Sequence, residues 1–182
     1  NNLTGGSYLI SAPLANYAGA ISNNIEIAQG LVFKAEQLSK EHKVKYVELR
    51  NQYEHNDLLK QDGFVTMILD LRGGIESVWK SKLKPKTRNQ VRKAQKNGLT
   101  VHEGINYLEE FYSIYAITIS KLGTPIFPIK MFKHLLEELK DSLKIFVVKY
   151  EGKIIGGLVF IIYGNTCYIP YASTLRNYNH FS

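Results

Sequence analysis

The sequence predicts an α+β fold, a mixed α/β arrangement whose last strands form an antiparallel sheet. In the second half of the chain, one short strand is followed by two helices and then by three strands. The dipeptides Glu151-Gly152 and Gly164-Asn165 are tight-turn sequences that join the three last strands as hairpins. A meander of this kind after two helices argues against a doubly wound parallel sheet.

The first half of the chain also combines strands with a helix. A strand is expected over residues 8–11, and it runs into the small-residue loop SAPLANYAGA. Asn23 and Asn24 are suitable N-cap residues for a helix, because apolar residues from Ile25 to Leu38 then recur at helical spacing. Two further strands are expected over 44–50 and 64–71, and residues 52–63 between them are polar and irregular. Glycines at 73 and 74 end the second of these strands.

A strongly basic segment, Trp79–Gly98, separates the two halves. It contains eight Lys or Arg residues and no acid, while the rest of the chain has 15 Lys+Arg against 16 Asp+Glu. The whole net charge of +7 therefore lies in this segment. A local positive field of this kind indicates a polyanionic or phosphorylated partner.

Two helical pieces are expected in the basic segment, with a break at Pro85. Thr87 and Gln90 fit a capping box, which predicts that the second helix begins at residue 88, and the Asn-Gly pair at 97–98 should end it.

Within that helix, Arg88, Arg92 and Lys96 fall on one stripe, where like charges oppose one another unless an anion binds. We prefer a phosphate-binding role for these three residues. The alternative is a solvated cationic surface.

The remaining elements follow from apolar periodicity and turn chemistry. A strand is expected over 99–103, and a helix over 107–122 carries its apolar side chains on one side. A Pro-bounded loop at 123–128 leads to a helix through residues 131–139. The last strands are expected over 144–150, 153–163 and 166–173.

Composition limits the classes of function. Hydrophobic residues make up 45% of the 182 residues, enough for a real core in one domain or a compact pair. The single Cys167 excludes an internal disulfide framework and a multi-cysteine zinc site, and we interpret it as a buried packing residue. The five histidines lack metal-ligand spacing, so no metal site is expected. No stretch reaches membrane-spanning length and no signal peptide is visible, so we expect a cytoplasmic protein.

Four stretches resemble the FemAB-like proteins, a group with the GNAT acyltransferase fold that includes the aminoacyltransferases building peptidoglycan interpeptide bridges. Ala18 departs from the family loop, in which Gly is usual at that position. The stretches are SAPLANYAGA, KPKTRNQVRKAQKNGL, YLEEFYSIYAITISKLGTPIFPIKMFKHLL and YIPYAST.

The resemblance implies two related GNAT-like subdomains: a partial one at 1–78 and a second at 99–182 that is truncated at its C-terminal end, with residues 79–98 as a basic helical connector. It also implies transfer of an acyl or aminoacyl group to an amine of a phosphorylated or cell-envelope acceptor, such as a peptidoglycan precursor. The donor would be aminoacyl-tRNA or acyl-CoA, and no permanently bound cofactor is expected. The GNAT phosphate-binding pattern does not occur in these 182 residues, so acetyl-CoA is neither supported nor excluded.

Four further residues are candidates for substrate contact. In the family, the loop after the first helix of the second subdomain faces the acceptor, so the resemblance assigns substrate contact to Lys121 and Phe127. The alternative is a rigid turn with Phe127 packed inward. Tyr171 and Ser173 end a strand and are candidates for positioning the acceptor, with core packing as a near-equal alternative.

No catalytic residue emerges from the sequence. The chain shows no Cys/His or Ser/His pairing, and amide-forming transfer does not require a covalent nucleophile. The competing hypothesis is a non-enzymatic nucleic-acid-binding protein that uses the basic residues from Lys80 to Lys96. A third reading is a structural remnant without activity.

Overall fold

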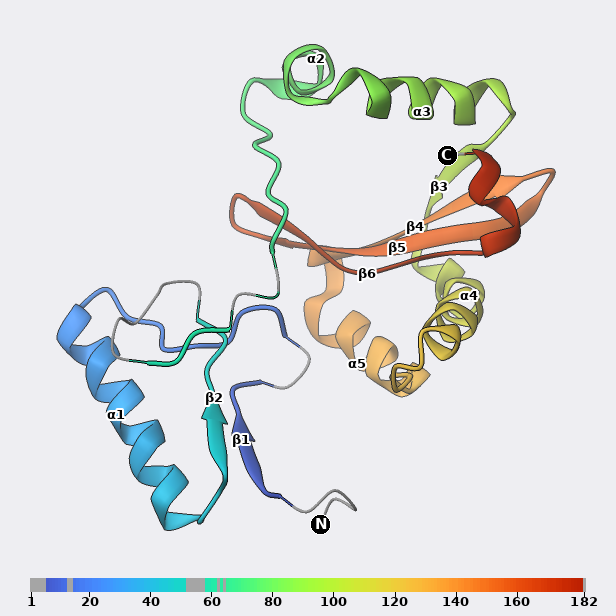
Figure 1. Cartoon of the computed structure of the whole chain (residues 1–182). Coiled ribbons are helices and arrows are strands. Elements are labelled where there is room, and N and C mark those ends of the chain that lie inside the picture. Colours follow the sequence, from blue (N-terminus) through green and yellow to red (C-terminus); the bar gives the residue numbers. More distant parts are fainter. Residues whose placement is uncertain (1–5, 13–14, 52–57, 62, 64, 182) are drawn as a thin grey trace. The chain divides into compact units, whose positions relative to one another are not determined.

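The computed structural model describes residues 6–12, 15–51, 58–61, 63 and 65–181 (Figure 1). By its internal contacts the chain divides into two compact units, Asn1–Met67 and Ile68–Ser182. The basic segment thus belongs to the second unit, whereas the three-part division at residues 78 and 98 stays a prediction. Within the described ranges, no helix is both long enough and apolar enough to cross a membrane.

The first unit contains a two-stranded parallel sheet and one long helix. Strands β1 (Tyr8–Ile10) and β2 (Tyr46–Glu48) pair side by side, and helix α1 (Ile25–Glu41) connects them. The side chain of Asn24 accepts a hydrogen bond from the backbone N–H of Glu26, which confirms the predicted cap. The predicted elements are therefore confirmed, with β2 shorter than expected.

The predicted strand over 64–71 is wrong for its described part. Residues 65–71 form no strand, and Val65, Met67 and Ile68 are 87%, 89% and 81% exposed. The apolar, β-prone sequence suggested a strand, but a strand also needs a partner for its backbone groups, and no described strand pairs with this segment. Parts of the predicted small-residue loop, of the irregular stretch and of this strand lie outside the described residues, at 13–14, 52–57, 62 and 64.

The second unit is built on a four-stranded antiparallel sheet in the order β3-β4-β5-β6, which confirms the predicted meander and the α+β class. At the first hairpin turn, Glu151 and Gly152 have φ of 49° and 76°, the positive values that a tight turn of this kind requires. The strands span Thr100–Glu103 (β3), Leu143–Tyr150 (β4), Lys153–Tyr163 (β5) and Thr166–Thr174 (β6).

Helices α4 (Leu108–Lys121) and α5 (Ile129–Leu139) cover one face of this sheet, as Figure 1 shows. Phe111 from α4 and Phe132 from α5 are almost fully buried against alternate residues of β4, such as Val147. Cys167, by contrast, is exposed, so its interpretation as a buried packing residue is wrong. It lies in the first half of the edge strand β6, where residues 166–169 are all exposed.

The basic segment lies on the opposite side of the sheet from α4 and α5 (Figure 1). The short helix α2 (Gly74–Ser77) precedes it, a π-helical turn (Val78–Lys82) forms its start, and α3 (Pro85–Lys96) forms the rest of its helical structure. The break before Pro85 is confirmed, but α3 begins at Pro85 and not at residue 88. Proline suits the first helical position because its missing N–H would have no partner there, and this preference outweighs the capping box at Thr87.

Candidate functional site

Arg88 is engaged within the protein. Its Nη1 group donates to the backbone oxygens of Trp79, Lys80 and Leu83 at 3.2, 3.0 and 2.9 Å. These carbonyls belong to the π-helical turn and to its end, where backbone acceptors lack partners within the helix. Arg88 therefore ties α3 to the turn that precedes it.

Arg92 and Lys96 differ in their surroundings. The guanidinium of Arg92 lies 5.5 Å from the centre of the Trp79 ring, in a cation–π contact, and Nη1 donates to Asn89 Oδ1 at 3.4 Å. Lys96 is exposed and has no ion pair or side-chain hydrogen bond with any described residue. The structure places all three predicted residues on α3. Of their charged groups, only the ammonium of Lys96 has no partner among the described residues.

A second polar face of α3 lines a surface depression of about 440 Å³. Lys86, Asn89, Gln90 and Lys93 line it, at positions one helical turn apart. Lys93 Nζ also donates to the backbone oxygen of His180 at 2.7 Å, which joins α3 to the C-terminal 3₁₀ turn (Arg176–Phe181). The sequence reasoning missed this face, because it followed the stripe of arginines.

Phe127 and Tyr171 lie together in an aromatic cluster beneath the sheet. Their ring centres are 6.0 Å apart, and Tyr171 also contacts Phe132 at 5.0 Å, in edge-to-face geometry. The hydroxyl of Tyr112 donates to the backbone oxygen of Phe127 at 3.1 Å, which fixes the loop between α4 and α5. Both residues thus have a packing role, and substrate contact by them stays a prediction.

Burial alters the acid–base chemistry of two tyrosines in this cluster. Desolvation raises the pKa of Tyr171, and the neighbouring Tyr115 and Tyr168 raise it further. Desolvation also raises the pKa of Tyr115, against a smaller opposing effect of a hydrogen bond that its oxygen accepts from the backbone of Phe127. Burial thus makes the phenolate form of both residues harder to reach, so their hydroxyls are hydrogen-bond donors rather than bases.

Ser173 ends β6 two residues beyond Tyr171. It is 5% exposed, and its Oγ has no hydrogen-bond partner among the described residues. A buried hydroxyl without a partner is uncommon and costs free energy, and because this oxygen is shielded from solvent, substrate contact by Ser173 stays a prediction. Lys121 differs, since it is exposed at the end of α4 and has no ion pair with a described residue.

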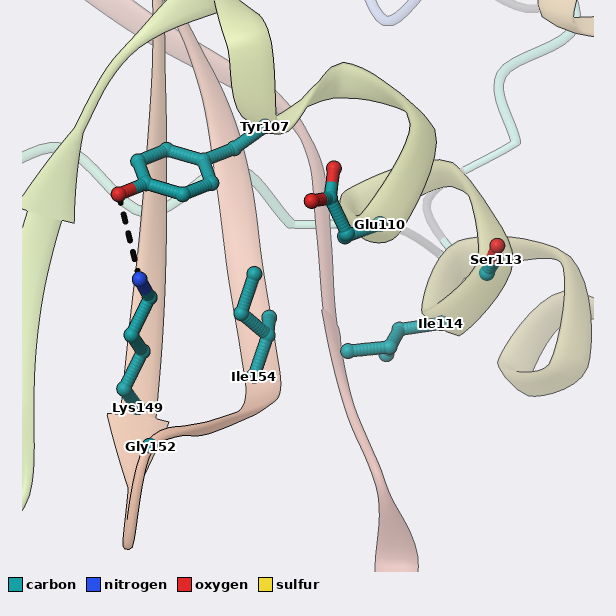
Figure 2. A pocket seen from close by; sticks show the side chains of 7 residues that line it. All are labelled: Tyr107, Glu110, Ser113, Ile114, Lys149, Gly152 and Ile154. Atoms are coloured by element: carbon teal, nitrogen blue, oxygen red, sulfur yellow. Dashed lines mark hydrogen bonds between the residues drawn. The ribbon is translucent and has the colours of Figure 1, made fainter.

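An open pocket of about 460 Å³ lies between α4 and the β4–β5 hairpin (Figure 2). Lys149 Nζ donates to the hydroxyl of Tyr107 at 3.2 Å and lies 4.7 Å from the centre of its ring. The pocket is also lined by Glu110, Ser113, Ile114, Gly152 and Ile154.

The sequence reasoning missed this pocket because Tyr107 and Lys149 are distant in the chain. One signal was present. Along β4 the residues facing α4 and α5 are Leu143, Ile145 and Val147, and the next position in that alternation is a lysine.

The comparisons with known proteins agree with this architecture. A family model described as an acetyltransferase (GNAT) domain matches residues 81–182. The chain belongs to this family. The predicted fold and the predicted relationship to GNAT acyltransferases are thereby confirmed.

The FemAB-like resemblance is supported by a curated relative. The UDP-N-acetylmuramoylpentapeptide-lysine N(6)-alanyltransferase of Weissella viridescens is 25% identical over 122 residues. The match covers 65% of this chain and 36% of the relative, so the chain spans about a third of that protein's length.

Two solved structures show a weaker likeness. A possible acetyltransferase from Clostridium difficile 630 has 13% identity and a TM-score of 0.37, covering 44% of this chain and 60% of that one. A functionally unknown conserved protein from Staphylococcus epidermidis ATCC 12228 has 14% identity and a TM-score of 0.38, covering 50% of this chain and 36% of that one. At these TM-scores neither likeness carries an argument, and the fold assignment rests on the observed topology and the family match.

Proposed function

We propose that this protein transfers an acyl or aminoacyl group to the amine of a cell-envelope acceptor. The observation that carries the proposal is the family match over residues 81–182 together with the 25% identity to an alanyltransferase. The name of that relative describes an alanyl group and the N6 amine of a lysine in a peptidoglycan precursor. The donor is proposed to be aminoacyl-tRNA or acyl-CoA, and the reaction to take place in the cytoplasm. Neither the family model nor this relative supports the alternative of a non-enzymatic nucleic-acid-binding protein.

The chemistry requires a deprotonated amine, a polarised carbonyl and close alignment of the two. In this proposal the neutral hydroxyl of Tyr171, whose pKa burial raises further, donates a hydrogen bond to the developing oxyanion or to the leaving group. Ser173 is proposed to position the acceptor indirectly, since its buried side chain lies two residues beyond Tyr171 on the same face of β6. Phe127 and Lys121, on the loop between α4 and α5 and at its start, contact the acceptor.

The anionic part of the substrate is proposed to bind helix α3. Lys96, and the exposed Arg92 beside Trp79, supply the positive charge for a phosphate group. Arg88 holds the helix in place through its contacts with three carbonyls. Loss of Lys96 should therefore weaken binding of a phosphorylated substrate without changing stability.

A transfer assay tests the proposal. The protein is incubated with a UDP-linked muramoyl pentapeptide and either alanyl-tRNA or acetyl-CoA, and the acceptor mass is followed. Transfer from one donor is expected, and Tyr171→Phe, which keeps the ring, should lower kcat by about tenfold or more. Tyr163→Phe is the matched control, because Tyr163 is 88% exposed at the end of β5 and should react normally. Equal rates for the two variants would refute the role of Tyr171.

A further inference from the structure

The pocket of Figure 2 contains two opposite charges that do not pair with each other. Glu110 has no ion pair or side-chain hydrogen bond with a described residue, and Lys149 has no acidic partner among them. Neighbouring acids are paired: Glu109 contacts Lys133 at 2.8 Å, and Glu103 lies 3.7 Å from Lys144. Glu110 and Lys149 are thus two opposite charges that the described residues leave unpaired within one pocket, while the acids beside them in the chain and on β3 are paired.

One end of the pocket donates hydrogen bonds. Lys149 Nζ uses one of its three protons on the Tyr107 oxygen and keeps two for a ligand. Because that oxygen accepts from Lys149, the hydroxyl proton of Tyr107 is itself free to be donated. An ammonium and a phenol side by side suit a carboxylate.

The other end accepts hydrogen bonds. Ser113 donates its only hydroxyl proton to the backbone oxygen of Glu109 at 2.9 Å, so it presents lone pairs to a ligand. The carboxylate of Glu110 is also an acceptor, and Figure 2 shows it between the Tyr107–Lys149 pair and Ser113. A carboxylate and a hydroxyl lone pair suit an ammonium group.

The floor between these ends is apolar, because Ile114, which is 5% exposed, and Ile154 point into the pocket (Figure 2). Tyr107 ends the 3₁₀ turn Ile105–Tyr107 and caps α4, so the helical rise puts the backbone positions of Tyr107 and Glu110 roughly 4.5 Å apart along the axis, and those of Tyr107 and Ser113 roughly 9 Å apart. The charged ends of a free amino acid share one carbon and are too close for this spacing. Those of an extended dipeptide are up to about 7 Å apart.

We propose that this pocket binds a short zwitterionic peptide, a dipeptide with an apolar side chain. Its carboxylate pairs with Lys149 and Tyr107, its ammonium pairs with Glu110 and Ser113, and its side chain lies on Ile114 and Ile154. The residues of this site take no part in the transfer chemistry proposed above. A negative result for peptide binding would therefore leave the proposed transfer function untouched, and a negative transfer assay would leave the proposed peptide site untouched.

The test is a titration of the isotope-labelled protein with the dipeptide Ala-Leu, followed by amide chemical shifts. Saturable shifts are expected at residues around the pocket, including Gly152. N-acetyl-Ala-Leu lacks the ammonium and Ala-Leu amide lacks the carboxylate, and each should bind about tenfold more weakly, a loss of about 1.4 kcal/mol.

Two variants assign each end of the ligand. Glu110→Gln should bind Ala-Leu about tenfold more weakly and should not distinguish it from the N-acetylated form. Lys149→Met should also bind Ala-Leu about tenfold more weakly, and it should not distinguish Ala-Leu from Ala-Leu amide. Glu109→Gln and Lys144→Gln are matched controls, because each removes a neighbouring charge of the same sign outside the pocket. Unfolding in urea shows whether each variant is folded.

Three results would overturn the proposal. The first is the absence of saturable shifts with Ala-Leu. The second is equal affinity of the wild-type protein for the three peptides, or equal losses in the pocket variants and their controls. The third is binding of free leucine as tight as that of Ala-Leu, which would show that the two ends of the pocket do not each bind one charged end of the peptide.

Discussion

Replacing Arg88 with alanine should destabilise the basic segment, although sequence reasoning gave this residue a binding role. The substitution removes the Nη1 group that reaches the backbone oxygens of Trp79, Lys80 and Leu83. One Nη group carries two protons, so these three contacts amount to about two charge-assisted hydrogen bonds. Each is worth about 1.5–3 kcal/mol at full burial. Because Arg88 is only half-buried, we expect a loss of about 2 kcal/mol in the free energy of unfolding.

Trp79 is the only tryptophan of the chain and lies in the π-helical turn that Arg88 holds. Its fluorescence therefore reports directly on the affected segment during urea unfolding. With a slope of about 2 kcal/mol per molar urea, the loss lowers the midpoint by about 1 M. Lys96→Ala is the matched control, since it removes a cation from the same stripe without removing a contact, and its effect should stay within about 0.5 kcal/mol.

An unchanged midpoint for Arg88→Ala would refute the structural role of this guanidinium, as would an equal decrease for Lys96→Ala. The prediction also affects how binding experiments are read. Weaker substrate binding in Arg88→Ala can result from a displaced α3, so Lys96→Ala is the cleaner test of phosphate contact.

Three further predictions concern stability. Phe111 is fully buried, so Phe111→Ala should cost about 3–5 kcal/mol in urea unfolding, and a cost below about 1 kcal/mol would contradict the assigned core. Hydrogen bonds from Arg72 and, to a smaller extent, from Lys82 hold the pKa of Asp70 below its ordinary value. The stabilisation that the Asp70 carboxylate gives to the folded state is therefore complete above the unfolded pKa of about 3.9, and it is lost as pH falls through the folded pKa. Carboxyl NMR should show Asp70 titrating below the other acids, and titration near pH 4 would refute the contacts. Burial raises the pKa of Tyr171. The contribution of its neutral hydroxyl to the free energy of unfolding is therefore present below the unfolded pKa of about 10, and it is lost as pH rises through the higher folded pKa. An absorbance titration should lose a late-ionising component in Tyr171→Phe, and an unchanged curve would contradict this.

The elements that sequence reasoning predicted well are those set by local chemistry. The turn at Glu151-Gly152 has the positive φ values that its sequence suggests, and it sets the β4–β5 hairpin. The apolar stripe of α4 matches the observed burial of Leu108, Phe111 and Tyr115. These features need no knowledge of distant parts of the chain.

The errors arose where two local signals compete or where a distant partner decides. Thr87 and Pro85 each signal a helix start, and the fixed φ of proline prevails. The apolar stretch 65–71 has strand propensity but no pairing partner among the described strands. The Lys149–Tyr107 contact joins residues 42 positions apart, a separation that periodicity cannot reveal. The pocket between α4 and the β4–β5 hairpin could not be predicted for the same reason, since its residues come together only in the folded chain.

The measurement that tests the central claim most directly is the mass of the acceptor after incubation with the protein and each donor. We expect the UDP-linked pentapeptide to gain one alanyl group from alanyl-tRNA or one acetyl group from acetyl-CoA, in an amide bond at an amine. An unchanged acceptor mass with both donors, in the presence of protein that unfolds cooperatively in urea, would contradict the assignment of this GNAT-family chain as an acyl or aminoacyl transferase.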